Sequence, residues 1–225
     1  MSLRPPKKSD LGKTWMKPRG GRVVRIQPEY HLIVTEGMET EPAYFRAVQD
    51  AVNRCYRGRV QLDVSGEGRN TLSLFDAARR RVRESLNGYR HVWIVYDTDD
   101  FPPEHVDQVA ELAAQYSGEE TTYHAVWSNQ CFELWFLLHF SYFQSDLHRS
   151  GYWPKLTECL QSMNAGSYRK NREDLYALLR PRLETAIANA RRLEEQNRGK
   201  PPSRAAPGTR MHELMETLLP YLPPA

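Results

Sequence analysis

The chain has 225 residues, 40% of them hydrophobic and 26% charged, so it can bury a sizeable core and needs no disulfide or metal for stability. Its cysteines, Cys55, Cys131 and Cys159, stand far apart without a CxxC pair, which argues against a disulfide framework or zinc ribbon and favours the reducing cytoplasm. The longest apolar run, 134–140, is too short to cross a bilayer, and no apolar signal segment follows the N-terminal charges, so neither membrane insertion nor secretion is expected.

The positive charge is concentrated at the N-terminus. Residues 1–25 hold eight Lys and Arg against Asp10 alone, so this segment carries +7 and the remainder −4 of the total charge of +3. Its basic character, with Pro and Gly, predicts a disordered arm that contacts phosphates or an acidic partner, or simply a solvated tail. Candidates for nucleic-acid contacts are Arg19, Arg22 and Arg25 in this arm and Arg69 in a later Gly-containing turn.

Strand and helix patterns alternate after the arm. Strands are expected at 30–35, 60–64, 91–97 and 121–127, and helices between them at 40–54, 72–86 and 102–116. In the second helix, five apolar side chains are expected to face inward: Leu72, Phe75, Ala78, Val82 and Leu86. The alternation predicts an α/β fold with a mostly parallel central sheet flanked by helices, and ligands bound beyond the carboxyl ends of the strands.

The pattern changes at Ser128. Residues 131–140 are apolar on nearly every side and predict a buried helix, and further helices are expected at 152–163, 172–197 and 209–219. We therefore divide the chain into a basic arm (1–25), an α/β domain (26–142) and a helical extension packed on it (143–225).

Carboxylates follow two of the predicted strands. Asp97 and Asp99 come directly after the strand at 91–97, and Glu36 ends the first strand, just before Gly37. Parallel strands deliver such side chains to one rim, where they could hold Mg²⁺ or Mn²⁺, since hard cations prefer oxygen ligands. The alternative is an Asp-rich turn in which Asp100 caps the next helix.

Two further acids stand in unusual surroundings. Glu133 lies among aromatic and aliphatic residues, where an uncompensated charge is expensive, so it is expected to have a partner. Its place just after the fourth strand puts it near the same rim, although a buried ion pair with an arginine would explain it equally. Glu41 opens the helix at 40–54, where it could complete a metal shell or merely favour the helix N-terminus.

Three ordered blocks resemble the RloB-like (AbiLii) proteins: VTEGMETEPAYF at 34–45, VYDTDDF at 95–101 and SNQCFELW at 128–135. The resemblance covers roughly 30–220 and departs from the family at Gln130, where Pro is expected. It implies a Toprim-like fold in which Glu36, Asp97 and Asp99 bind Mg²⁺ and assist phosphodiester chemistry, while Glu41 matches a second acid that related nucleases use for a second metal. Glu133 is a further candidate metal ligand because of its expected place near the same rim. Lys170, in a family-like Tyr-Arg-Lys block, would then stabilise the transition state, or be an ordinary solvated lysine.

The resemblance also implies a function. RloB-like proteins resemble effector nucleases of bacterial anti-phage abortive infection and are usually partnered with an AAA-type ATPase, RloA. The expectation is a cytoplasmic Mg²⁺-dependent nuclease that acts on nucleic acid, alone or as a homo-oligomer, with such a partner. A phosphatase of the haloacid-dehalogenase type fits less well, because Phe101 stands where that motif needs Thr or Val. A non-catalytic nucleic-acid-binding or signalling module is the remaining alternative; the chain has no GxxxxGK[ST] loop.

Overall fold

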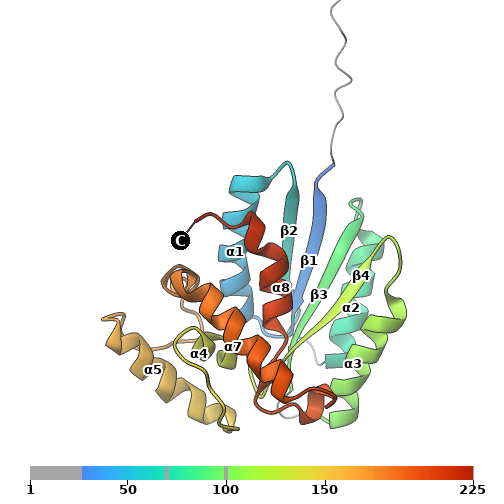
Figure 1. Ribbon diagram of the computed structural model, residues 1–225. Helices are drawn as coiled ribbons and strands as arrows, with labels where there is room; N and C mark the ends of the chain where they lie inside the picture. The colour runs from blue at the N-terminus through green and yellow to red at the C-terminus, as the bar shows by residue number, and fades with distance from the viewer. Residues whose placement is uncertain (1–26, 69–70, 99–100, 225) are drawn as a thin grey trace, which may run out of the picture.

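The computed structural model describes residues 27–68, 71–98 and 101–224 (Figure 1). The basic arm with Arg19, Arg22 and Arg25 lies outside the described residues, and so do Arg69 and Asp99. The predicted roles of these residues therefore stay predictions.

Five strands form one sheet in the order β2-β1-β3-β4-β5. The first four, β1 (Glu29–Thr35), β2 (Val60–Gly66), β3 (Tyr89–Asp97) and β4 (Thr122–Asn129), are parallel and confirm the predicted sheet. The fifth, β5 (Gly208–Thr209), pairs antiparallel with β4 at the edge. Its two residues are too few to show a period-two pattern, so it was missed at the junction with the helix expected at 209–219.

Helices cover both faces of this sheet (Figure 1). The connecting helices are α1 (Thr40–Tyr56), α2 (Thr71–Glu84) and α3 (Pro103–Tyr116). Alternate residues of each central strand point to opposite faces, so Leu32 and Val34 pack with α2 and α3 while Ile33 packs with α1. The central strands β1 and β3 are buried on both faces along most of their length, as is typical of parallel sheets.

The C-terminal part is helical and shares a core with the α1 face of the sheet. Its helices are α4 (Glu133–Leu138), α5 (Tyr152–Ser162), α6 (Leu175–Leu179), α7 (Leu183–Gln196) and α8 (Met211–Leu218). Short 3-10 turns lie at Arg149–Gly151, Arg180–Arg182, Pro202–Arg204 and Leu219–Tyr221. All six residues of α4 are buried, as the apolar run predicted. The division of the chain at residue 142 stays a prediction.

Two further details of the sequence-based assignment were wrong. The helix expected at 172–197 is broken at the 3-10 turn Arg180–Arg182, because Pro181 lacks the N–H that a continuous helix needs. Leu86 was expected to face inward but is fully exposed, because α2 ends at Glu84 and Leu86 lies in the turn before β3. Among the described helices, none has the length and apolar character needed to cross a membrane.

Candidate active site

The carboxylates of the first and third strands meet where these strands end. Because β1 and β3 are adjacent and parallel, with Thr35 opposite Val95, the residues that follow lie at the same edge of the sheet. The Glu36 N–H donates to the Val95 carbonyl at 3.0 Å. The Asp97 backbone N–H donates to Glu36 Oε2 at 3.1 Å. Two residues 61 positions apart are thereby joined, as the parallel strand ends predicted.

Glu41 lies in the first turn of α1 and is almost fully buried, with 6% of its surface exposed. Gly37 makes this position available, because a Cβ there would lie 2.7 Å from the Glu41 carboxyl carbon. Burial raises the pKa of Glu41 and the negative charge of Glu133 raises it further, whereas Lys170 and backbone N–H groups act in the opposite direction. A cation near Glu41 would therefore favour its ionised form.

Glu133, the first residue of α4, is also almost fully buried. Its Oε1 accepts two hydrogen bonds, from Trp153 Nε1 at 3.0 Å and from the Tyr168 hydroxyl at 2.9 Å. The expected partner is therefore present, but as an indole and a phenol rather than an arginine. Burial raises the pKa of Tyr168 and the neighbouring Glu133 raises it further, so the phenol keeps its proton and remains a donor.

Two adjoining cavities contain these groups. The first, about 490 Å³, is lined by Glu36, Glu41, Asp97 and Glu133, and we call it the acid cavity. The second, about 420 Å³, is lined by Trp153, and we call it the tryptophan cavity. They share a wall formed by Asp97, Glu133, Arg149 and Lys170. All the predicted site acids that the structure describes thus line one cavity, together with the predicted Lys170.

Positive charge lies on the shared wall. Lys170 is exposed, and its Nζ lies 5.1 Å from the centroid of the Trp153 ring. Arg149 is also exposed, and its backbone N–H donates to Gln130 Oε1 at 2.9 Å. Gln130, the departure from the expected family block, therefore fixes the backbone that carries Arg149.

Sequence reasoning missed three residues of this site: Arg149, Trp153 and Tyr168. Tyr168 had a signal, since it precedes Lys170 in the block recognised as family-like. Arg149 and Trp153 had none, because their places depend on how the loop after α4 returns α5 to the strand ends.

The donor set at the acid cavity suits a hard cation, since every acid there offers carboxylate oxygens. Within residues 27–68, 71–98 and 101–224, however, no three of these acids have ligand atoms mutually within 4.8 Å. Mg²⁺ is commonly held by one or two carboxylates, with water and substrate phosphates completing the shell. The joined pair of Glu36 and Asp97 fits that kind of site. The predicted contribution of Asp99 lies outside the described residues.

A different cluster, at the amino ends of β1 and β3, brings ligand atoms of Glu29, His31 and His91 within 4.8 Å of one another. Trp93 Nε1 donates to His31 Nδ1 at 3.3 Å, so the proton of neutral His31 is on Nε2, which lies 2.9 Å from Glu29. Burial lowers the pKa of His31 to about 4. With both nitrogens engaged, His31 offers no lone pair to a metal, and the cluster is a hydrogen-bonded chain continued by His91 and His124.

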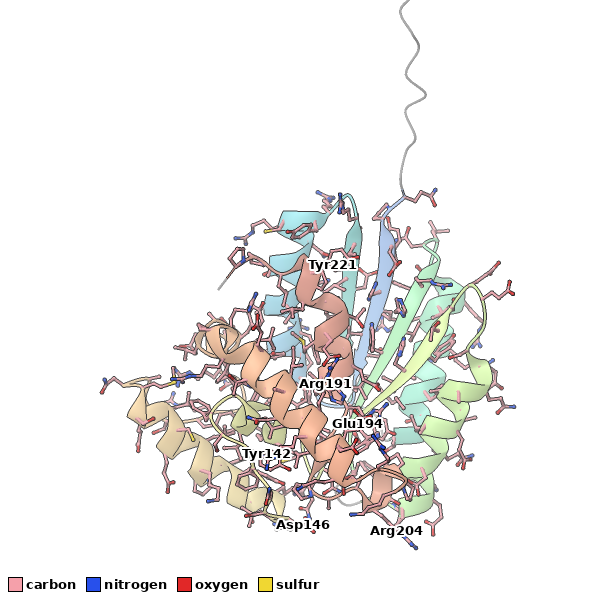
Figure 2. The ribbon with its side chains drawn as sticks, viewed as in Figure 1. Tyr142, Asp146, Arg191, Glu194, Arg204 and Tyr221 are labelled. Atoms are coloured by element: carbon pink, nitrogen blue, oxygen red, sulfur yellow. The ribbon has the colours of Figure 1, made fainter. Side chains whose placement is uncertain are left out.

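A third cluster joins Glu194 of α7, which is labelled in Figure 2, to His212 and Glu213 of α8. Arg210 donates to both glutamates, and His212 Nε2 lies 2.9 Å from Glu194. A guanidinium thus occupies the place between the carboxylates, and the cluster is an ion-paired junction of the two helices rather than a metal site.

Comparison with known proteins gives one match. The model of the family described as RloB-like protein covers residues 31–218. No curated protein and no solved structure matches the chain. The match spans most of the sequence. It includes β1 from His31 onward, the other four strands and the residues that line both cavities. The chain therefore belongs to the RloB-like protein family.

Proposed function

We propose that this protein is a metal-dependent nuclease that hydrolyses phosphodiester bonds at the acid cavity. The observation that carries the proposal is the hydrogen bond from the Asp97 N–H to Glu36 Oε2, which joins the acids at the ends of β1 and β3. Glu41, Glu133 and Lys170 line the same cavity. Carboxylates that line one cavity together with a lysine suit the binding of a cation and a phosphate.

Glu36 and Asp97 would hold Mg²⁺ or Mn²⁺, with Asp99 and Glu41 as further candidate ligands. The bound cation would supply Lewis-acid polarisation of the scissile phosphate and offset its charge. Lys170 would place a positive charge beside the phosphate oxygens, where negative charge develops in the transition state. Glu36 would take a proton from the attacking water or return one to the leaving oxygen.

Glu133 has a positioning role in this proposal. Its Oε1 accepts hydrogen bonds from both Trp153 and Tyr168. These bonds fix its carboxylate between α4, α5 and the loop that carries Lys170. Its charge also acts on Glu41 across the cavity. We therefore expect Glu133 to maintain the shape and negative charge of the cavity rather than to transfer a proton.

The cellular context of the proposal rests on family membership. An RloB-like chain is expected to act in the bacterial cytoplasm with an AAA-type ATPase of the RloA kind, as the effector of an anti-phage abortive-infection system. A Toprim-like fold is consistent with acids at the ends of two adjacent parallel strands. The strands β1 and β3 have this arrangement. Co-expression with an RloA-type ATPase, followed by co-purification, tests the partnership.

The test of the activity is a cleavage assay with DNA and RNA in the presence of Mg²⁺, Mn²⁺ or EDTA, with and without the ATPase. Asp97→Asn and Glu36→Gln should each abolish cleavage, while their thermal melting stays cooperative. Asp50→Asn, an exposed acid on α1, is the matched control and should cleave normally. Nucleic-acid binding without turnover under every metal condition would instead support the non-catalytic module.

A further inference from the structure

We propose that Trp153 stacks on a base of a single-stranded nucleic acid, and that the adjacent phosphate lies at the wall shared by the two cavities. This assigns the tryptophan cavity to substrate recognition and names single-stranded DNA or RNA as the substrate class. It rests on the proposed function, in that the acid cavity next to it is taken as the place of cleavage.

Trp153 combines exposure with a fixed position. It belongs to the first turn of α5, and 45% of its surface is exposed, whereas Leu156 and Leu160 of the same helix are fully buried. Its Nε1 donates to Glu133 Oε1 at 3.0 Å, which ties the indole to an acid of the cavity. An exposed indole held in one orientation is a ready platform for base stacking, because every base offers a flat aromatic face.

Positive charge lies over one face of this indole, which leaves the stacking position to the other face. Lys170 Nζ lies 5.1 Å from the ring centroid, and Arg149 lines the same cavity. Both residues also line the acid cavity, as Asp97 and Glu133 do, so the proposed stacking position and these carboxylates adjoin one shared wall. A nucleotide whose base covers Trp153 would therefore bring its phosphate towards Lys170 and Arg149 and next to Asp97.

The shape of the site favours a single strand. Each cavity, at about 490 and 420 Å³, has the size of a pocket for a small ligand rather than of a groove for a duplex. A base in a duplex is already stacked and paired, and it would have to be extruded to reach Trp153. A single strand can present an unstacked base without that cost. Met38, 71% exposed on the rim of the acid cavity, offers an apolar contact for the neighbouring nucleotide.

The experiment measures binding in the Asp97→Asn background, so that turnover does not interfere. A fluorescently labelled single-stranded oligonucleotide, made as DNA and as RNA, is compared with a hairpin duplex of the same sequence. We expect tighter binding of the single strand by Asp97→Asn protein. Adding Trp153→Leu should weaken single-strand binding about 5- to 150-fold, the range found when a stacking aromatic is removed, and leave duplex binding unchanged.

Trp153→Phe is the matched variant, because it loses the N–H bond to Glu133 but keeps an aromatic ring. It should retain most of the single-strand affinity that Trp153→Leu loses. Binding should also quench tryptophan fluorescence in the parent protein and do so less in Trp153→Phe. Equal affinities of the Leu and Phe variants, or equal binding of single strand and duplex, would overturn the proposal. Thermal melting of both variants checks that the fold is retained.

The two proposals fail in different ways. If Asp97-dependent cleavage is absent but single-strand binding depends on Trp153, the proposed nuclease activity is wrong and the recognition site stands. If Asp97-dependent cleavage occurs and Trp153→Leu binds and cleaves like the parent protein, the activity stands and the recognition site is wrong. The DNA and RNA oligonucleotides separate the two chemical forms of the same substrate class.

Discussion

Gly37 lies so close to Glu41 that a Cβ on the glycine would sit 2.7 Å from the Glu41 carboxyl carbon. A glycine just after a strand commonly serves a sharp turn. The main role of Gly37 is to leave room for a buried carboxylate of the next helix. The loop from Glu36 to α1 is therefore shaped by the acid cavity that it borders.

Gly37→Ala should lower the free energy of unfolding by about 1–3 kcal/mol, because the added methyl group overpacks the contact with Glu41. It should also reduce cleavage, because Glu36 precedes the displaced residue. Chemical denaturation measures the first effect and the Mg²⁺-dependent assay the second. Gly58→Ala is the matched control, since a Cβ there meets nothing within 4 Å. Equal stability of the two variants would contradict the close approach.

Tyr168→Phe should destabilise the protein by about 1.5–3 kcal/mol, the typical contribution of a hydrogen bond to a charged group. The substitution removes the hydroxyl that donates to the buried Glu133 at 2.9 Å, and leaves the ring in place. Urea unfolding at neutral pH measures the change. Tyr56→Phe is a suitable comparison, because the half-buried Tyr56 contacts the Tyr221 ring through its own ring. A change no larger than that of Tyr56→Phe would show that Trp153 alone satisfies Glu133.

The residues of the site were predictable where regular strands position them, and not where an irregular loop does. Glu36 and Asp97 were predictable as neighbours because each follows a strand, and adjacent parallel strands end at one edge of the sheet. The contact of Trp153 with Glu133 was not, because the loop after α4 has no periodic pattern that would fix the return of α5. Asp99 was named on the same grounds as Asp97, and its place lies outside the described residues.

The fold shows the same division. The four parallel strands and their connecting helices were predictable because each has its own hydrophobic periodicity. The residues at which these elements end were not, because they depend on local competition between helix, strand and turn. Pro181 interrupts a run that is otherwise helical on both sides. Gly208 and Thr209 form a strand only because β4 offers them an edge with which to pair. Tertiary contacts, rather than local preference, decide such short elements.

Glu41→Gln should change the stability of the protein in a pH-dependent way. The folded protein raises the pKa of Glu41 above its ordinary value of 4.5, so it retains a proton that the unfolded chain has released. This carboxyl group therefore contributes stability at pH 4 that is lost as the pH rises towards the folded pKa. The Glu41→Gln variant cannot ionise at this position. Its free energy of unfolding should therefore exceed that of the parent protein by more at pH 8 than at pH 5.

Urea titrations at these two pH values, without divalent cations, measure the difference. Asp50→Asn, which removes an exposed charge from the same helix, should show little dependence. Saturating Mg²⁺ should reduce the advantage of Glu41→Gln at pH 8, because a cation near the cavity favours the ionised glutamate. An advantage that is the same at both pH values would mean that Glu41 ionises as it does in the unfolded chain.

His139→Asn should make the protein less sensitive to acid. His139 is fully buried, its Nδ1–H donates to the Trp135 carbonyl at 2.9 Å, and its Nε2 has no hydrogen-bond partner among the described residues. Burial lowers the pKa of His139 from 6.5 to about 4, because a charged imidazolium there would be desolvated. Between these two values the unfolded chain binds a proton that the folded protein does not, so stability falls as the pH drops.

The expected slope for one such histidine is at most about 1.4 kcal/mol per pH unit between the two pKa values. His31 and His124 act in the same direction, since burial also lowers the pKa of each to about 4. The free energy of unfolding, measured at half-unit steps from pH 7 to pH 4, should therefore fall less steeply in His139→Asn than in the parent protein. The asparagine keeps an N–H donor but does not titrate in this range. His105→Asn, at an exposed position of α3, is the control, and its free energy of unfolding should vary with pH as that of the parent protein does. If the His139→Asn curve ran parallel to both of these, the proposed effect of burial on His139 would be wrong.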